Sequence, residues 1–254
     1  MEEQVIFRLP ELSIPVQELP NLLWELDLME LLVTRHLERL HASKFKPSRE
    51  EQEEFFKSFL KKEGLTDSSR LNEWLSRNNL TENSVTKSLY KALQLWQLKC
   101  SLFGEKVEST FLAQKSNLDR ISYSMLRVKG KGAASEIYMQ LVEGESTFSE
   151  LASKYSEGAE RERGGRLGPM EVGQMNPELS ERLKASHAGQ LWPPFEASGW
   201  WVVLRHEKSY PSALDEKTRE RIINSLYQEW IKDQISIWMK TQSPGNSLLK
   251  QDIE

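Results

Sequence analysis

The sequence predicts an α+β protein: an all-helical domain built from N-terminal helices and one C-terminal helix, with an inserted unit of strands and helices. Apolar residues recur every three or four positions through residues 1–117, the spacing of an amphipathic helix. Two runs rich in strand-forming residues then bracket residues 118–208, and the helical spacing returns in residues 209–254. We therefore expect three segments: a helical domain, an inserted domain, and a C-terminal helix that docks on the first domain and ends in a frayed tail.

Composition narrows the function. The chain has 254 residues with 34 Lys and Arg against 38 Asp and Glu, a formal net charge of −4. This acidic balance argues against a nucleic-acid partner, which requires a basic surface. The single cysteine, Cys100, excludes an internal disulfide, and no apolar run reaches the roughly 20 residues that membrane insertion requires. The four histidines form no metal-ligand cluster, so we expect a cytoplasmic protein without metal or cofactor.

The N-terminal segment predicts several helices. Leucine-rich spacing from Glu18 to His41 indicates one long amphipathic helix. Ser48 has the capping-box glutamate three positions later, so it begins a second helix that Gly64 ends. A short third helix carries Trp74, and Thr81 is placed to cap a fourth. A last helical segment closes residues 1–117, which are expected to be helical throughout.

The middle segment changes character. Residues 121–128 and 199–206 are strand-like, and residues 133–143 and 147–155 are helical. The Gly-rich residues 158–173 are expected to form a loop. The predicted order is strand, helix, helix, loop, helix, strand.

The C-terminal segment predicts one long helix over about residues 215–240, followed by a frayed tail from Ser243. Its stripe includes Leu226, Trp230 and Trp238. Leaving a large apolar side chain in water forgoes roughly 1.5–3 kcal/mol of burial. The helix therefore needs an apolar partner, and the N-terminal helices provide one.

The middle unit contains four sequence motifs in an order that is typical of a known protein family. They are FSELASKYS at 148–156, GGRLG at 164–168, GQMNPEL at 173–179, and GQL followed by Pro193 and Pro194. This series resembles the signature of parvulin-type (PpiC, or rotamase) peptidyl-prolyl cis-trans isomerases. The layout of a helical region, this unit and a returning helix resembles the SurA and trigger-factor-like foldases.

The resemblance implies an antiparallel sheet covered by helices, with a shallow apolar pocket for a proline ring. Leu167, Met175 and Leu179 fall at the positions of the proline-binding wall, where family members usually have an aromatic residue in place of Leu179. Asn176 falls at the position of a polar residue that bonds the substrate backbone, and Ser198 at that of a hydroxyl before the last strand. The same three apolar residues also fit the ordinary core of an α+β domain.

The sequence departs from the family at its catalytic floor. Two family histidines are matched by Ser124 and Trp201, and the family cysteine or aspartate by Gly158, with Glu157 beside it. Ser124, Glu157, Ser198 and Trp201 are therefore the candidate catalytic residues. Trp200 and Trp201 point to opposite faces of a strand, and the alignment directs Trp201 toward the pocket.

Two functions remain open. Twisting an amide crosses a barrier of about 18–20 kcal/mol without making a covalent bond, so an apolar pocket can assist without a nucleophile. We expect an isomerase and foldase-chaperone with reduced catalysis, acting on proline-containing peptides or unfolded clients. The alternative is a silent peptide-binding chaperone or adaptor for maturation or export of a precursor peptide. A hydrolase built on Ser124 is disfavoured because no motif supplies its base.

Overall fold

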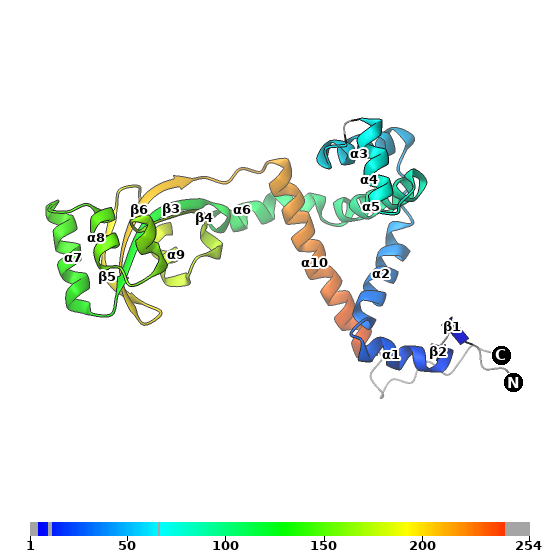
Figure 1. Cartoon of the computed structure of the whole chain (residues 1–254), viewed down its shortest axis with the longest axis horizontal. Coiled ribbons are helices and arrows are strands. Elements are labelled where there is room, and N and C mark those ends of the chain that lie inside the picture. The colour runs from blue at the N-terminus through cyan, green and yellow to red at the C-terminus, as the bar shows by residue number, and fades with distance from the viewer. Residues whose placement is uncertain (1–4, 10–11, 66, 242–254) are drawn as a thin grey trace. The chain divides into compact units, whose positions relative to one another are not determined.

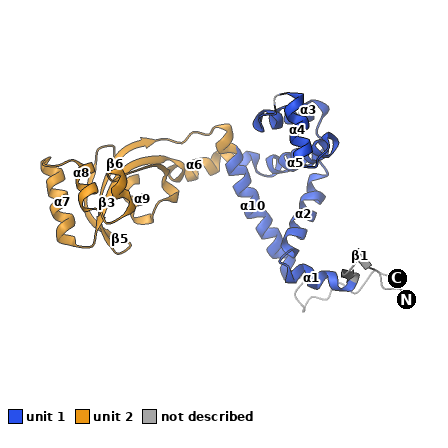
Figure 2. Cartoon of the chain, viewed as in Figure 1, with its two compact units in different colours: residues 1–106, 220–254 blue, residues 107–219 orange. Residues whose placement is uncertain are grey.

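The computed structural model describes residues 5–9, 12–65 and 67–241. It divides into two compact units, residues 1–106 with 220–254, and residues 107–219 (Figures 1 and 2). The predicted α+β class is confirmed: one unit is built from N-terminal helices and a C-terminal helix, and the other contains a four-stranded antiparallel sheet. The predicted tail from Ser243 lies outside the described residues. No helix among the described residues is long and apolar enough to cross a membrane.

The first unit is mostly helical. Its elements are β1 (Val5–Leu9), β2 (Leu12–Pro15), η1 (Val16–Glu18), α1 (Leu19–Glu25), α2 (Met29–Ala42), α3 (Arg49–Lys62), α4 (Ser68–Arg77), α5 (Glu82–Phe103), η2 (Gly104–Lys106) and most of α10 (Glu216–Thr241). The short antiparallel pair β1–β2 was not predicted, because residues 1–117 were expected to be helical throughout. The strand-forming run of Val5, Ile6 and Phe7 is the signal that was missed.

Two helix starts follow the predicted caps. The Ser48 hydroxyl accepts from the Glu51 backbone N–H at 3.2 Å, and the Glu51 carboxylate accepts from the Ser48 N–H at 2.7 Å. Thr81 accepts from the Ser84 N–H at 3.2 Å at the start of α5. Gly64 follows α3 with φ of 69°, the left-handed conformation expected of a helix end.

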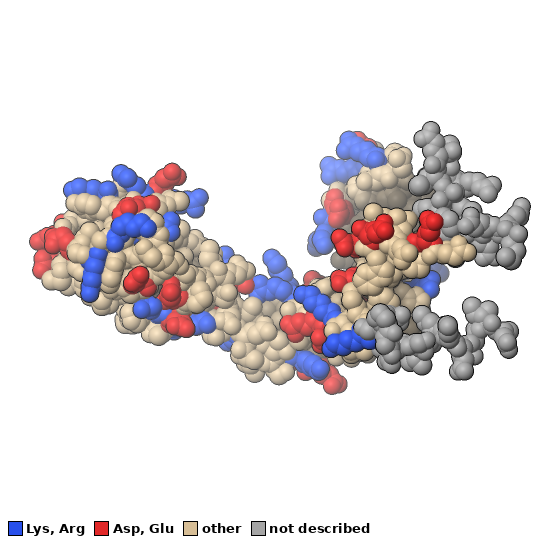
Figure 3. Space-filling model, turned by 90° about the horizontal axis from the view of Figure 1, so that it is seen from below, with Lys and Arg blue, Asp and Glu red and all other residues tan. Residues whose placement is uncertain are grey.

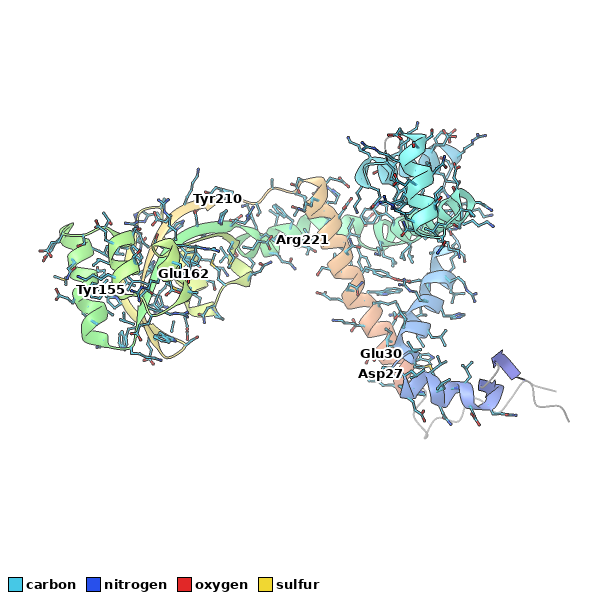
Figure 4. All side chains as sticks on the ribbon, in the orientation of Figure 1. Asp27, Glu30, Tyr155, Glu162, Tyr210 and Arg221 are labelled. Carbon is cyan, nitrogen blue, oxygen red and sulfur yellow. The ribbon has the colours of Figure 1, made fainter. Side chains whose placement is uncertain are left out.

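The single helix predicted over residues 18–41 is wrong. It is broken into α1 and α2 at Asp27, whose φ of 54° places it in the left-handed region that aspartate tolerates. The Leu28 N–H bonds to the Leu23 carbonyl at 2.8 Å across this break. Leu26 and Leu40, expected on a continuous buried stripe, are 56% and 52% exposed. Asp27 and Glu30 are labelled at this junction in Figure 4.

The C-terminal helix α10 contributes to the core of the first unit. Tyr227 and Ile231 are buried together with Phe103 of α5, and Leu37 of α2 packs against them. The Tyr227 hydroxyl donates to the Glu38 carboxylate at 3.2 Å. These contacts give the apolar stripe of α10 its partner within the unit.

The second unit contains α6 (Val107–Leu118), β3 (Arg120–Val128), α7 (Lys131–Glu143), α8 (Phe148–Tyr155), η3 (Ala159–Arg163), β4 (Arg166–Glu171), η4 (Val172–Gln174), α9 (Pro177–Lys184), β5 (Leu191–Ala197) and β6 (Trp200–Tyr210). The strand order is β4-β3-β6-β5, and every neighbouring pair is antiparallel. Figure 1 shows α7 and α8 on one side of the sheet and α9 on the other.

The predicted order of elements omitted two strands. The expected loop over residues 158–173 contains η3 and β4, and β5 follows α9. Both strands are edges of the sheet, where a proline costs no ladder hydrogen bond on the outer side. Pro169 lies in β4, and Pro193 and Pro194 lie in β5, which explains why a strand pattern was not recognised there.

Candidate functional site

The sheet has two faces with separate cores. Along β3, the side chains of Ile121, Tyr123 and Met125 pack with η4 and α9, whereas Leu126 and Val128 pack with α7 and α8. We call these the α9 face and the α7/α8 face. Tyr123 is buried on the α9 face, and burial, followed by the charge of Glu160, raises the pKa of its phenol. The predicted site residues are divided between the two faces.

The three predicted wall residues lie together on the α9 face. Met175 precedes α9 and Leu179 lies within it, and both are more than nine-tenths buried. Leu167 of β4 is half-buried against the same cluster. Met125, Trp192 and Trp200 are also half-buried there, so these three residues and Leu167 provide the apolar surface that remains accessible.

Asn176 and Ser198 meet at the edge of this face. The Asn176 Nδ2 group donates to the Ser198 hydroxyl at 3.1 Å, and its Oδ1 accepts from the Glu178 N–H at 2.9 Å as the cap of α9. Ser198 occupies the turn between β5 and β6 with φ of 50°. Both residues are exposed, so each retains hydrogen-bonding capacity for a peptide backbone.

An ion pair fills the position beside Gly158. The Arg127 Nε lies 3.4 Å from the Glu160 Oε1, and the Glu160 side chain is only 4% exposed. The Ser156 hydroxyl donates to the same carboxylate at 2.6 Å. A Cβ at Gly158 would collide with the ends of both Arg127 and Glu160. Glycine therefore leaves the space that this ion pair occupies.

Two cationic side chains lie over the ring of Trp200. The Lys129 Nζ lies 3.6 Å from the centroid of the Trp200 ring, and the Arg127 guanidinium carbon lies 5.4 Å from it. Such contacts favour a cation over an aromatic face. The Arg127 Nε is buried and has no hydrogen-bond acceptor among the described residues. Its ion-pair partner there is Glu160.

Glu157 fixes the loop to the sheet. Its carboxylate accepts from the Lys129 backbone N–H at 2.9 Å, and its own N–H bonds to the Arg127 carbonyl at 2.9 Å. These bonds hold the segment after α8 against the end of β3. The structure thus places Glu157 next to the site, with its carboxylate engaged by the backbone.

Ser124 and Trp201 lie on the α7/α8 face, away from the wall residues. The expectation that Trp201 faces the pocket is wrong: it packs against the core of α7 and α8, and Trp200 is on the α9 face. The Ser124 hydroxyl donates to Glu207 at 2.5 Å, and Arg205 donates to the same carboxylate at 2.8 Å. Burial acts to raise the pKa of Glu207, but these bonds outweigh it and the pKa lies below its ordinary value.

Sequence reasoning missed Met125, Arg127, Glu160 and Trp200 as neighbours of the wall. The available signal was the two-residue period of β3, since Ile121 and Tyr123 belong to the core face and odd-numbered positions continue it. Glu160 had no such signal, because it comes from a 3-10 turn inside the segment read as a loop.

The comparisons with known proteins match the second unit to a family. Residues 126–208 match the family described as Rotamase: PPIC-type PPIASE domain. This segment contains all the wall residues, the Arg127–Glu160 pair, and Asn176 and Ser198 at the edge of the α9 face.

Two curated relatives are each similar to less than half of the chain. Chaperone SurA of Alkalilimnicola ehrlichii is 28% identical over 104 residues, 40% of this chain and 24% of the relative. Chaperone SurA of Colwellia psychrerythraea is 28% identical over 113 residues, 44% of this chain and 26% of the relative. The matched segment thus spans about a quarter of these relatives. The cytoplasmic location expected from the sequence stays a prediction.

Solved structures are similar at low identity. The peptidylprolyl isomerase PrsA of Bacillus cereus is 21% identical with a TM-score of 0.45, over 100% of this chain and 96% of that one. One of the two SurA-like chaperones PEB4 and Cj1289 of Campylobacter jejuni is 18% identical with a TM-score of 0.37, over 99% of each chain.

Proposed function

We propose, from the premise that residues 126–208 form a parvulin-type domain, that the chain is a peptidyl-prolyl cis-trans isomerase that also acts as a foldase-chaperone. The observation that carries this proposal is the match of residues 126–208 to the PPIC-type family together with the convergence of Leu167, Met175 and Leu179 on one face. The substrates are proline-containing peptides and unfolded polypeptides. Neither a metal nor a cofactor enters the reaction.

Isomerisation requires an apolar binding surface for the proline and no nucleophile or base, because no covalent bond is broken. An X-Pro amide isomerises by twisting about its C–N bond, and the partial double bond that resists this twist is weakened when water leaves the carbonyl. In the proposed complex the proline ring packs on Leu167, Met125 and Trp200, which are among the half-buried apolar residues of the α9 face. Asn176 and Ser198 hold the substrate backbone by hydrogen bonds at the edge.

The Arg127–Glu160 pair provides the polar centre of the proposed site. Glu160 is buried and fixed by Ser156, so it keeps the Arg127 side chain beside Trp200. A guanidinium held beside the apolar surface favours a carbonyl oxygen or an acidic side chain next to the proline. It has no role in breaking bonds, because none is broken.

Reduced turnover is part of the proposal. Among the described residues of the α9 face, the histidine present is His206, which is 1% exposed and has both ring nitrogens within hydrogen-bond distance of serine hydroxyls. It is therefore committed to structure. On the α9 face the proposed substrate then meets the Arg127–Glu160 pair and apolar side chains rather than an accessible imidazole, and we expect a slow isomerase.

The second candidate function, a peptide-binding chaperone without turnover, is favoured by the Arg127–Glu160 pair at the position of the family's cysteine or aspartate. Exchange NMR on a short X-Pro peptide separates the two functions. Turnover above the uncatalysed rate that falls in Trp200→Ala and persists in Trp201→Phe supports catalysis at the α9 face. If the chain binds the same peptide but isomerisation proceeds at the uncatalysed rate, only the peptide-binding function is supported.

A further inference from the structure

The first two helices expose an unusual amount of apolar surface. Six large side chains between residues 24 and 40 are 40–56% exposed: Trp24, Leu26, Leu28, Leu31, Leu32 and Leu40. Single exposed leucines are ordinary, but a concentration of this kind marks an interaction site.

The buried cluster of Phe103, Tyr227 and Ile231 contacts α2 at another position. Leu37 packs toward Phe103 and Tyr227. Leu28, which caps α2, is 40% exposed, and Leu31 and Leu32 of α2 are 51% and 50% exposed.

The exposed row continues into a groove between α2 and α5. Positions 28, 31, 32, 35, 38, 39 and 42 follow the three-and-four spacing of one helix side. The groove is lined by Arg35, Glu38, Arg39, Ala42 and Ser43 of α2 and by Ser88, Lys91, Ala92, Gln94 and Leu95 of α5. We define the α2 surface as Leu28, Leu31, Leu32, Arg35, Arg39 and Lys91.

The groove end of the α2 surface is cationic. Arg35 bonds to Glu38 at 2.8 Å, and Glu38 also accepts from Tyr227 at 3.2 Å. Within the part of the chain that the structure describes, Arg39 and Lys91 pair with no carboxylate. Two cations thus remain unneutralised beside an apolar row, in a chain whose formal net charge is −4.

We propose that the α2 surface binds polypeptide segments in which apolar side chains are followed by acidic ones. Leu28, Leu31 and Leu32 take the apolar side chains, and Arg39 and Lys91 take the carboxylates. The proposal rests on the proposed chaperone function, and it names a second client-binding site that requires no proline. A second copy of the chain fits less well, because an isologous contact over the groove brings the same cations together.

Two proline-free labelled peptides test this. One carries leucines and phenylalanine followed by glutamates, and the other has lysine in place of each glutamate. Fluorescence anisotropy with the full chain should give a Kd at least ten-fold lower for the glutamate peptide, with the preference weakening in high salt. Equal Kd values for the two peptides would overturn the proposal.

Variants locate the site. Arg39→Glu with Lys91→Glu should raise the Kd for the glutamate peptide at least ten-fold. Leu31→Ser with Leu32→Ser should raise the Kd for both peptides. The matched control is Arg49→Glu with Arg70→Glu, whose side chains are 89% and 65% exposed in α3 and α4 of the same unit. It should leave both Kd values unchanged, and a loss equal to that of the groove variant would overturn the assignment.

Two further readouts keep the alternatives apart. Turnover of a proline peptide should be equal in the wild type and in Arg39→Glu with Lys91→Glu. If the wild type shows no turnover but still prefers the glutamate peptide, the proposed isomerase activity is wrong and the proposed site on the α2 surface stands. Sedimentation velocity should show no self-association that depends on Leu31 and Leu32. If self-association disappears in Leu31→Ser with Leu32→Ser, a second copy occupies the surface and the proposal is wrong.

Discussion

Arg127 and Glu160 form a 3.4 Å ion pair in the space that a side chain at position 158 would fill. Glu160 comes from η3 and Arg127 from β3, so the pair links the segment after α8 to the sheet. The Glu160 side chain is 4% exposed and the Arg127 side chain is 35% exposed. The charge is thus buried on one side and partly accessible on the other, where it borders the Trp200 ring.

Removing the arginine should destabilise the second unit. In Arg127→Ala, Glu160 stays buried without its counter-charge, at a cost on the order of 2–3 kcal/mol. Glu160→Gln keeps an acceptor for Ser156 and should cost less. Adding Glu160→Gln to Arg127→Ala should recover part of the loss, because the two residues are coupled. Urea unfolding measures all three variants, and additive losses would contradict the coupling.

Peptide affinity should depend on Leu167 more cleanly than on Leu179. Leu179 is 7% exposed, so Leu179→Ala weakens the fold together with the site. Leu167 is half-buried, and Leu167→Ala should raise the Kd for a proline peptide about ten-fold with little change in melting temperature. Leu141→Ala on the α7/α8 face is the matched control. If Leu167→Ala binds the proline peptide as tightly as the wild type and the Leu141→Ala control do, the peptide site lies elsewhere.

Installing histidines at positions 124 and 201 should not raise turnover. Both side chains lie on the α7/α8 face, where Ser124 is bonded to Glu207 and Trp201 packs against the helices. Ser124→His with Trp201→His therefore places imidazoles away from the wall residues and should lower the melting temperature. Increased turnover by a folded double variant would show that catalysis uses the other face.

How far the sequence predicts this structure differs between elements. Ser48 and Thr81 have local capping partners, so the helices that they begin were predictable from a few neighbouring residues. The strands β4 and β5 hold prolines and form the edges of the sheet. β5 pairs with β6 across the turn at Ser198 and Gly199, whereas β4 pairs with β3, which precedes α7, α8 and η3 in the chain. Local propensity contains no information about such partners.

The site shows the same division. The wall residues Leu167, Met175 and Leu179 could be predicted from the order of their motifs along the chain, and the structure places them in one cluster. The expectation for Trp201 failed because an error of one position along a strand moves a side chain to the other face. Arg127 and Glu160 are 33 positions apart, and nothing in their local sequence marks them as partners.

Docking of α10 should account for much of the stability of the first unit. Tyr227 is 1% exposed, its hydroxyl bonds to Glu38, and Lys99 lies 4.6 Å from its ring centroid. Burial, followed by the Glu38 charge, raises the pKa of this phenol, so it remains a neutral donor. Tyr227→Ala should cost about 3–5 kcal/mol and Tyr227→Phe about 1 kcal/mol in urea unfolding.

The matched control for this docking is Ile237→Ala, since Ile237 lies on the same helix and is 56% exposed. It should leave the free energy of unfolding nearly unchanged. A Tyr227→Ala variant as stable as this control would show that α10 contributes little to the unit.

His206 should make the second unit less stable in mild acid. It is 1% exposed, its Nδ1 lies 2.7 Å from the Ser186 hydroxyl, and its Nε2 lies 2.9 Å from the Ser209 hydroxyl. Burial lowers the pKa of this imidazole below its ordinary value, so the folded chain takes up a proton less readily than the unfolded chain. As pH falls through about 6.5, the unfolded chain is protonated first and the free energy of unfolding decreases.

This loss continues until the pH passes the folded pKa, below which both states are protonated. It cannot exceed about 1.4 kcal/mol per pH unit for one proton. Urea unfolding between pH 8 and pH 5 should therefore show a slope that His206→Gln reduces. The matched control is His187→Gln, because His187 is exposed and its backbone N–H, not its ring, bonds to Gln190. A slope that survives in His206→Gln and disappears in His187→Gln would assign the effect to the exposed histidine and contradict the prediction.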